Sequence, residues 1–117
     1  MSARQGVGAV LFLALAACGS ATPPPASTAE MDAVTTALSN CLGQAAERLD
    51  DGKSDAATIA LAMQPMCATQ FSQFEEANGR TLNPAAYNLY LAKVRPHRLE
   101  VATGIVLRVR AVRAGGK

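Results

Sequence analysis

Residues 49–57, LDDGKSDAA, interrupt a helical pattern and decide how the chain folds. Gly52 is typical of a helix stop, because glycine adopts backbone conformations that other residues avoid. Ser54 is a typical N-cap, and Asp55 favours the first turn of a following helix through its charge on the helix dipole. The stretch therefore predicts a turn between two helices that fold back on each other.

Apolar residues recur at spacings of three and four on both sides of this turn, as they do on one face of a helix. When two helices pack antiparallel around a turn, residues whose numbers share one sum face each other. Leu49 with Ile59 and Val34 with Phe74 both sum to 108, so the two stripes match in register. The stripes comprise Met31, Val34, Leu38, Cys41, Ala45 and Leu49 before the turn and Ile59, Met63, Cys67, Phe71 and Phe74 after it.

Cys41 and Cys67 fall in the same register, which predicts a disulfide between the two helices. Closing that loop would stabilise the fold by about 3.5 kcal/mol on the chain-entropy model. Two buried free thiols are the alternative. There is no Cys-x-x-Cys spacing for a redox-active pair, and two cysteines with the single, distant His97 do not supply four metal ligands. We therefore expect no metal site and no cofactor.

Prolines and a glycine divide the rest of the chain. Pro65 is expected to kink the second helix or to restart it at Met66. Asn78-Gly79 is typical of a helix end. Asn83-Pro84 combines an N-cap residue with a proline at the first helical position, and so it predicts the start of another helix.

The segment after Pro96 fits two patterns. A helical stripe fits Ala102, Ile105, Val109 and Val112, whereas residues 107–110 alternate like a strand. A lone strand has no partner elsewhere in the chain, so helix is favoured. We therefore predict an all-α fold, in which a small helical hairpin stapled by one disulfide is followed by a C-terminal helix kinked near Pro96.

The charges are segregated along a chain of 117 residues, a length that suits one small domain. Residues 18–79 hold two basic and eight acidic residues, a net charge of −6, whereas residues 80–117 hold eight basic and one acidic, a net charge of +7. Either the acidic half docks on the basic half, or the basic end is free to meet an anionic surface.

The N-terminal residues resemble an export signal. Residues 7–16 form an apolar run that matches a signal peptide and is shorter than the roughly 20 residues of a membrane-spanning helix. Leu15-Ala16-Ala17-Cys18 resembles the lipobox of bacterial lipoproteins. The resemblance implies that the signal peptide, residues 1–17, is cleaved between Ala17 and Cys18, and that the Cys18 thiol carries lipid. An ordinary secretory signal and an uncleaved apolar helix are the alternatives.

The resemblance also implies a location. Gly19 is not the aspartate that favours inner-membrane retention in the enterobacterial sorting pattern, which implies the outer membrane facing the periplasm. Residues 18–29 are small, hydroxylated or proline, so they predict an extended tether from the lipid to a helical domain at residues 30–113. Residues 114–117 are expected to fray.

Arg108, Arg110 and Arg113 are the candidate binding residues of the basic end. They form a solvated face, dock onto the acidic hairpin, or contact an anionic envelope component such as lipid headgroups, lipopolysaccharide phosphates or an acidic partner. Nucleic acid is not an expected partner, because the resemblance implies export and no aromatic residues are interleaved with the basic residues.

The lipobox resemblance and the tether that follows it imply a membrane-anchored lipoprotein with a structural or protein-interaction role. The alternative is a binding module for an anionic envelope component through the basic end. An enzyme is not expected, because the sequence has no glycine-rich phosphate loop and no serine–histidine arrangement, and we assign no catalytic residue. The oligomeric state stays open.

Overall fold

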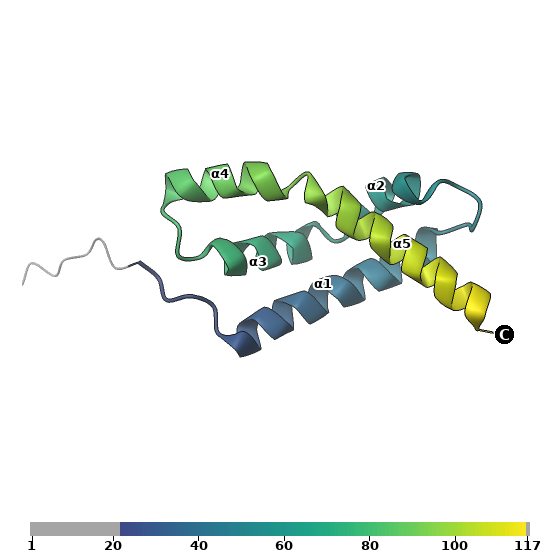
Figure 1. Cartoon of the computed structure of the whole chain (residues 1–117), viewed down its shortest axis with the longest axis horizontal. Coiled ribbons are helices and arrows are strands. Elements are labelled where there is room, and N and C mark those ends of the chain that lie inside the picture. The colour runs from purple at the N-terminus through teal and green to yellow at the C-terminus, as the bar shows by residue number, and fades with distance from the viewer. Residues whose placement is uncertain (1–21, 117) are drawn as a thin grey trace, which may run out of the picture.

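The computed structural model describes residues 22–116, which fold into five helices and no strand. In Figure 1, α3 lies beside α1, α4 lies beyond α3, and α5 crosses obliquely over α1 and α2. The predicted all-α class is confirmed, and the segment after Pro96 is helix. The helices are α1 (Thr28–Leu49), α2 (Ala56–Met66), α3 (Ala68–Gly79), α4 (Pro84–Val94) and α5 (His97–Gly115).

The predicted hairpin and its disulfide are confirmed. α1 packs against both α2 and α3, and a disulfide joins Cys41 to Cys67 with 5.9 Å between the two Cα atoms. Cys67 and its neighbour on the stripe, Met63, are fully shielded from solvent, and Leu42 of α1 is 1% exposed. The bridge is therefore part of the apolar contact between the helices, with Cys67 in the core and Cys41 partly buried against it.

Asp51 organises the turn, and the helix cap differs from the predicted one. The carboxylate of Asp51 accepts hydrogen bonds from the backbone N–H groups of Lys53 and Ser54 and from the Ser54 hydroxyl, at 2.9, 2.7 and 2.6 Å. The Ser54 hydroxyl is therefore occupied, and Asp55 is the N-cap of α2 in its place. These bonds, the Ser54 side chain first, lower the pKa of Asp51 to about 2. Gly52 has the left-handed φ of 70° that the turn requires.

The two prolines break helices rather than bend them. Pro65 lies in the last turn of α2, and the chain turns at Cys67, so α3 starts just after the predicted restart at Met66. The predicted kink near Pro96 is a full break between α4 and α5. Proline has no N–H and its ring clashes with the preceding turn, so each break falls within two residues of the proline.

The helical domain is longer than predicted at both ends. The Ser27 hydroxyl accepts from the Glu30 N–H, and the Glu30 carboxylate accepts from the Ser27 N–H, both at 3.1 Å. This capping box starts α1 at Thr28, inside the residues predicted as tether. α5 continues to Gly115, past the predicted end at Arg113, so the first half of the predicted frayed tail is helical.

The core is formed by α1, α2, α3 and α5, whereas no residue of α4 is buried. Where α5 crosses the hairpin, Ala102 and Val106 are fully shielded. Small side chains at this crossing allow the helix backbones to approach closely. The buried cluster comprises Leu38, Leu42, Ala45, Ala46, Ala56, Ile59, Ala60, Met63, Cys67, Phe71, Ala102 and Val106.

Replacing both cysteines by alanine, C41A/C67A, is expected to lower the free energy of unfolding by about 3.5 kcal/mol, because the unfolded chain regains the entropy of an open loop. The measurement is urea unfolding of the full chain, with the unsubstituted protein under reducing conditions as a second test of the same bond. Equal stability of the variant and the oxidised parent would contradict the prediction.

Candidate functional site

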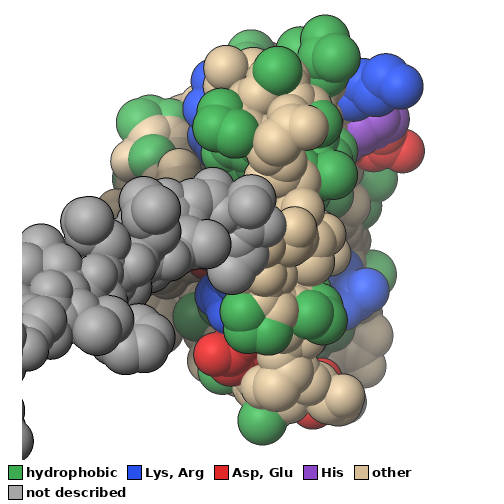
Figure 2. Space-filling model, turned by 90° about the vertical axis from the view of Figure 1, so that its left-hand side faces the viewer, with side chains coloured by type: hydrophobic (Ala, Val, Ile, Leu, Met, Phe, Trp, Pro, Cys, Tyr) green, Lys and Arg blue, Asp and Glu red, His purple; other side chains and the backbone are tan. Residues whose placement is uncertain are grey.

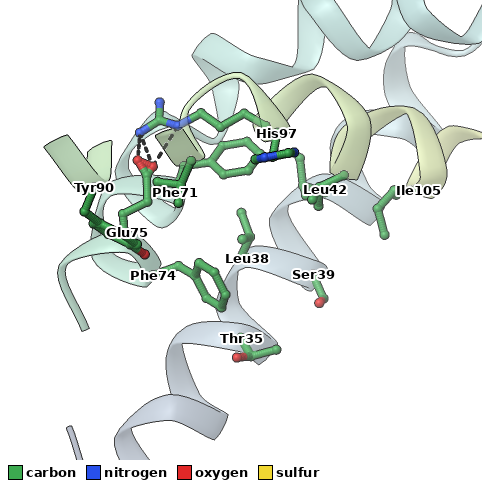
Figure 3. A pocket seen from close by; sticks show the side chains of 13 residues that line it. Thr35, Leu38, Ser39, Leu42, Phe71, Phe74, Glu75, Tyr90, His97 and Ile105 are labelled. Carbon is green, nitrogen blue, oxygen red and sulfur yellow. Dashed lines mark hydrogen bonds and ion pairs between the residues drawn. The ribbon is translucent and has the colours of Figure 1, made fainter. Parts of the chain in front are cut away.

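An apolar pocket of about 320 Å³ opens between α1, α3, α4 and α5. Its walls are aliphatic and aromatic side chains, and the exposed polar residues Thr35, Ser39 and His97 also contact it (Figure 3). The volume falls at the lower end of the range for small-molecule sites. The pocket is lined by Thr35, Leu38, Ser39, Leu42, Phe71, Phe74, Glu75, Tyr90, Val94, His97, Arg98, Val101 and Ile105.

A buried ion pair between α3 and α5 forms part of the pocket wall. Nε and Nη2 of Arg98 donate to the Glu75 carboxylate at 2.9 and 2.7 Å, and Glu75 is 3% exposed. The Arg98 guanidinium also lies over the ring of Phe71, 5.1 Å from its centroid. Burying a charge is costly unless it is paired, so each of these two residues requires the other.

Tyr90 and His97 are two further polar residues that contact the pocket. Burial, and after it the charge of Glu75, raises the pKa of Tyr90, which keeps its phenol neutral. His97 is exposed, and its Nδ1 lies 3.1 Å from Oε2 of Glu100. Within residues 22–116, histidine, cysteine and acidic side chains form no group of three that is placed to hold a metal ion.

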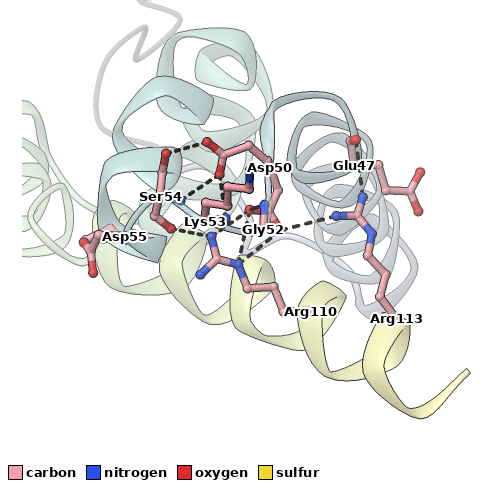
Figure 4. A network of polar contacts seen from close by, with 10 residues as sticks. Glu47, Asp50, Gly52, Lys53, Ser54, Asp55, Arg110 and Arg113 are labelled. Atoms are coloured by element: carbon pink, nitrogen blue, oxygen red, sulfur yellow. Dashed lines mark hydrogen bonds and ion pairs between the residues drawn. The ribbon is translucent and has the colours of Figure 1, made fainter.

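Asp50, at the end of α1, is the second charged centre (Figure 4). Its side chain is fully shielded, and its carboxylate accepts from Arg110 Nη2 at 2.7 Å and from Arg113 Nη1 at 3.3 Å. Arg110 also donates to the Ser54 carbonyl, and Arg113 to the Glu47 carbonyl. The hydrogen bond from Arg110 holds the pKa of Asp50 below its ordinary value of 3.8, and the same bond raises the pKa of Arg110.

The three candidate arginines of the basic end do not form one free surface. Arg110 and Arg113 lie on the acidic turn, whereas Arg108 is exposed and has no ion pair among residues 22–116. The arrangement matches docking of the acidic half on the basic half, one of the two alternatives from the charge pattern. A surface that used all three arginines would have to compete with Asp50.

Arg80, in the basic half of the chain, pairs with two carboxylates of the acidic half. Arg80 Nη1 lies 2.8 Å from Oε2 of Glu30, and Arg80 Nε lies 3.0 Å from Oε1 of Glu76. Arg80 lowers the pKa of Glu76, and the two carboxylates raise the pKa of Arg80. The start of α1 is therefore tied to the end of α3.

Sequence reasoning did not identify the pocket or the ion pair in its wall. A signal for the pair exists, because no charged residue occurs between Asp55 and Glu75, and Glu75 follows Phe71 by four positions on the apolar stripe. An acidic residue on such a stripe indicates a buried partner. The partner itself, Arg98, lies 23 residues further along the chain, and no local pattern indicates it.

The predicted cleavage and lipidation residues, Ala17 and Cys18, lie outside the described residues, as does the predicted signal peptide. None of the helices within residues 22–116 is long and apolar enough to span a membrane. Comparisons with protein-family models, with curated proteins and with solved structures gave no match.

Replacing Glu75 by methionine, E75M, is expected to lower the free energy of unfolding by about 3 kcal/mol, because Arg98 is left as an unpaired charge in the pocket wall. The double variant E75M/R98M removes both charges and is expected to recover most of that loss. Urea unfolding of both variants tests this. A double variant as unstable as E75M would show that the pair is not a coupled unit.

Replacing Arg110 by glutamine, R110Q, is expected to lower the Tm more than R108Q does, although both variants lose one positive charge from α5. The folded-state pKa of Asp50 is depressed, so its contribution to stability is present above pH 4 and is lost as the pH falls through the folded pKa. The Tm difference between the two variants should therefore be largest near pH 7 and should narrow as the pH falls below 4. Equal melting of R110Q and R108Q at pH 7 would contradict the role of Arg110.

Proposed function

We propose that this protein is a small lipoprotein of the bacterial cell envelope, held at the membrane by lipid on Cys18, whose helical domain has a protein-interaction role. The observation that carries the proposal is the division of the three cysteines. Cys41 and Cys67 form a disulfide, which is typical of an oxidising compartment such as the periplasm. Cys18 is the one that remains, and it stands in the Leu15-Ala16-Ala17-Cys18 sequence that resembles a lipobox.

The spacing between Cys18 and α1 supports the same proposal. Nine positions separate Cys18 from the N-cap Ser27, and residues 23–25 are consecutive prolines. An extended segment of this length spans about 28 Å. Such a spacer would hold the domain clear of the lipid headgroups, and Gly19 after Cys18 is the basis for proposing the periplasmic side of the outer membrane.

Exposed apolar side chains support the interaction role. Figure 2 shows hydrophobic side chains grouped at the top of the face that it presents, where α4 lies. Leu89 of α4 is 69% exposed, and Leu61 of the uncharged helix α2 is 57% exposed. Apolar side chains gathered on one face, as at α4, are typical of protein contacts, and Leu61 is a separate exposed apolar residue on α2. Large apolar residues exposed within residues 22–116 include Leu61, Met66, Leu82, Leu89, Val101, Leu107 and Val112.

The anchor is tested by growing bacteria that express the full chain with an alkyne-tagged palmitate. The parent is expected to take up the tag and to sediment with outer membranes, whereas C18S should lose the tag and keep residues 1–17. The variant C41A/C67A is the matched control, because it loses two cysteines and should keep the tag. A tagged C18S protein, or a parent whose Cys18 is unmodified by mass spectrometry, would overturn the anchor.

The interaction role is tested by placing a photo-crosslinking amino acid at Leu89 or at Leu61 of the full chain in living cells. We expect a discrete adduct with one envelope protein from at least one of these positions. Asp32, which is exposed on α1, is the control position and should give none. No adduct from either position, or the same adducts from all three, would contradict the role.

A further inference from the structure

The pocket between α1, α3, α4 and α5 shares only Val101 with the exposed apolar residues on which the proposed interaction role rests. We propose that this pocket binds a single aliphatic chain of about ten carbons, as carried by fatty acids, fatty alcohols and lipids.

The walls match a ligand segment without polar atoms. Leu38, Phe71, Phe74 and Ile105 surround the space from three helices (Figure 3). The charged groups of the lining, Glu75 and Arg98, are bonded to each other. A peptide segment inserted here would bring N–H and C=O groups that find few partners, and burying them unpaired is costly. A hydrocarbon chain brings no such groups.

The volume of the pocket limits the length of the hydrocarbon chain that it can hold. An engineered apolar cavity of about 150 Å³ holds benzene, which has six carbons. The pocket, at about 320 Å³, is about twice that size and so accommodates roughly ten to twelve carbons. A single leucine or phenylalanine side chain from a partner protein would leave much of this space empty, which disfavours a peptide anchor as the occupant.

The surroundings of the pocket suit an amphiphile whose head group stays in water. Thr35 and Ser39 of α1 are exposed and have hydroxyl groups beside the apolar walls. α4 provides Tyr90 and Val94 to one wall, yet it has no buried residue and is bounded by chain breaks at both ends. Displacing α4 to admit a chain would therefore disrupt little packing.

The aliphatic chain in the pocket belongs either to a free amphiphile or to the lipid proposed on Cys18. Thr35 lies eight residues beyond Ser27, about 12 Å along α1, and the spacer of about 28 Å can cover that distance. Only the second source rests on the proposed function. The binding chemistry is the same in both cases, so the experiment has one arm for each.

The probe is a dodecanoic acid that carries a diazirine on its chain and a terminal alkyne, added to envelope membranes that contain the full-length protein. Labelled peptides are mapped by mass spectrometry after irradiation. We expect labels on pocket residues of α1, α3 and α5, and a reduction of at least tenfold by excess decan-1-ol but not by butan-1-ol. Labels that excess decan-1-ol leaves unchanged, or that fall outside the pocket, would overturn the proposal.

Two variants of adjacent exposed residues on α1 provide the matched test. S39F places a ring at the pocket, whereas N40F adds the same ring at a residue that does not line it. S39F should lose at least nine-tenths of the label and N40F should keep it, with both variants checked for an unchanged helical circular dichroism spectrum. V101F blocks the pocket from α5 if S39F does not fold. Equal labelling of the folded blocking variant and N40F would overturn the proposal.

The C18S protein identifies the source of the chain. If the lipid on Cys18 fills the pocket, C18S should take up several times more probe than the parent. If a free amphiphile is the ligand, the parent and C18S should be labelled equally. Both results support an aliphatic chain in the pocket, whereas absence of competed labelling in both proteins contradicts it. Loss of palmitate from C18S tests the anchor separately, so the two proposals can fail independently.

Discussion

Two arginine–carboxylate pairs fix α5 across the helical hairpin, and both the core and the pocket depend on that position. Arg98 binds Glu75 of α3, and Arg110 binds Asp50 at the end of α1. The two arginines are twelve residues apart, about 18 Å along α5. Between them, Ala102 and Val106 are fully shielded by the hairpin. Because much of this core is alanine, the apolar contact alone tolerates small rotations of α5, whereas hydrogen-bonded charges are directional and restrict them.

The pocket exists because two chain breaks separate helices that would otherwise pack side by side. Pro65 ends α2, and the disulfide of Cys67 holds the break against α1, so that α3 continues along α1 with its phenylalanines facing it. Pro96 separates α4 from α5, which leaves α4 beside α3 and without a buried side chain. The four helices therefore enclose space that their own side chains do not fill. An apolar space with a charge-paired wall suits a hydrocarbon ligand, and the exposed apolar residues outside it suit a protein partner.

The hairpin, its register and the disulfide could be predicted because each depends on residues close together in sequence or on a helical period. The cap of α2 could not, because Ser54 and Asp55 are both good caps and the choice between them depends on Asp51, which uses the Ser54 hydroxyl. The capping box of Ser27 and Glu30 was readable in principle, since its residues have the standard spacing. Charge segregation predicted that the acidic and basic halves could meet, but not which residues would pair.

The sequence by itself determined the helical segments, the points at which proline and glycine interrupt them and the antiparallel pairing around residues 49–57, since helical periodicity and turn chemistry act over a few residues. Only the tertiary structure decided that Arg110 is paired with Asp50 and that Arg108 has no ion pair within residues 22–116, although a single residue separates the two arginines. A helix rotates about 200° over two residues, so the two side chains leave α5 on nearly opposite faces. Which face meets Asp50 depends on how α5 crosses the hairpin. Many small contacts between residues distant in sequence set the position of that crossing. The same contacts create the pocket.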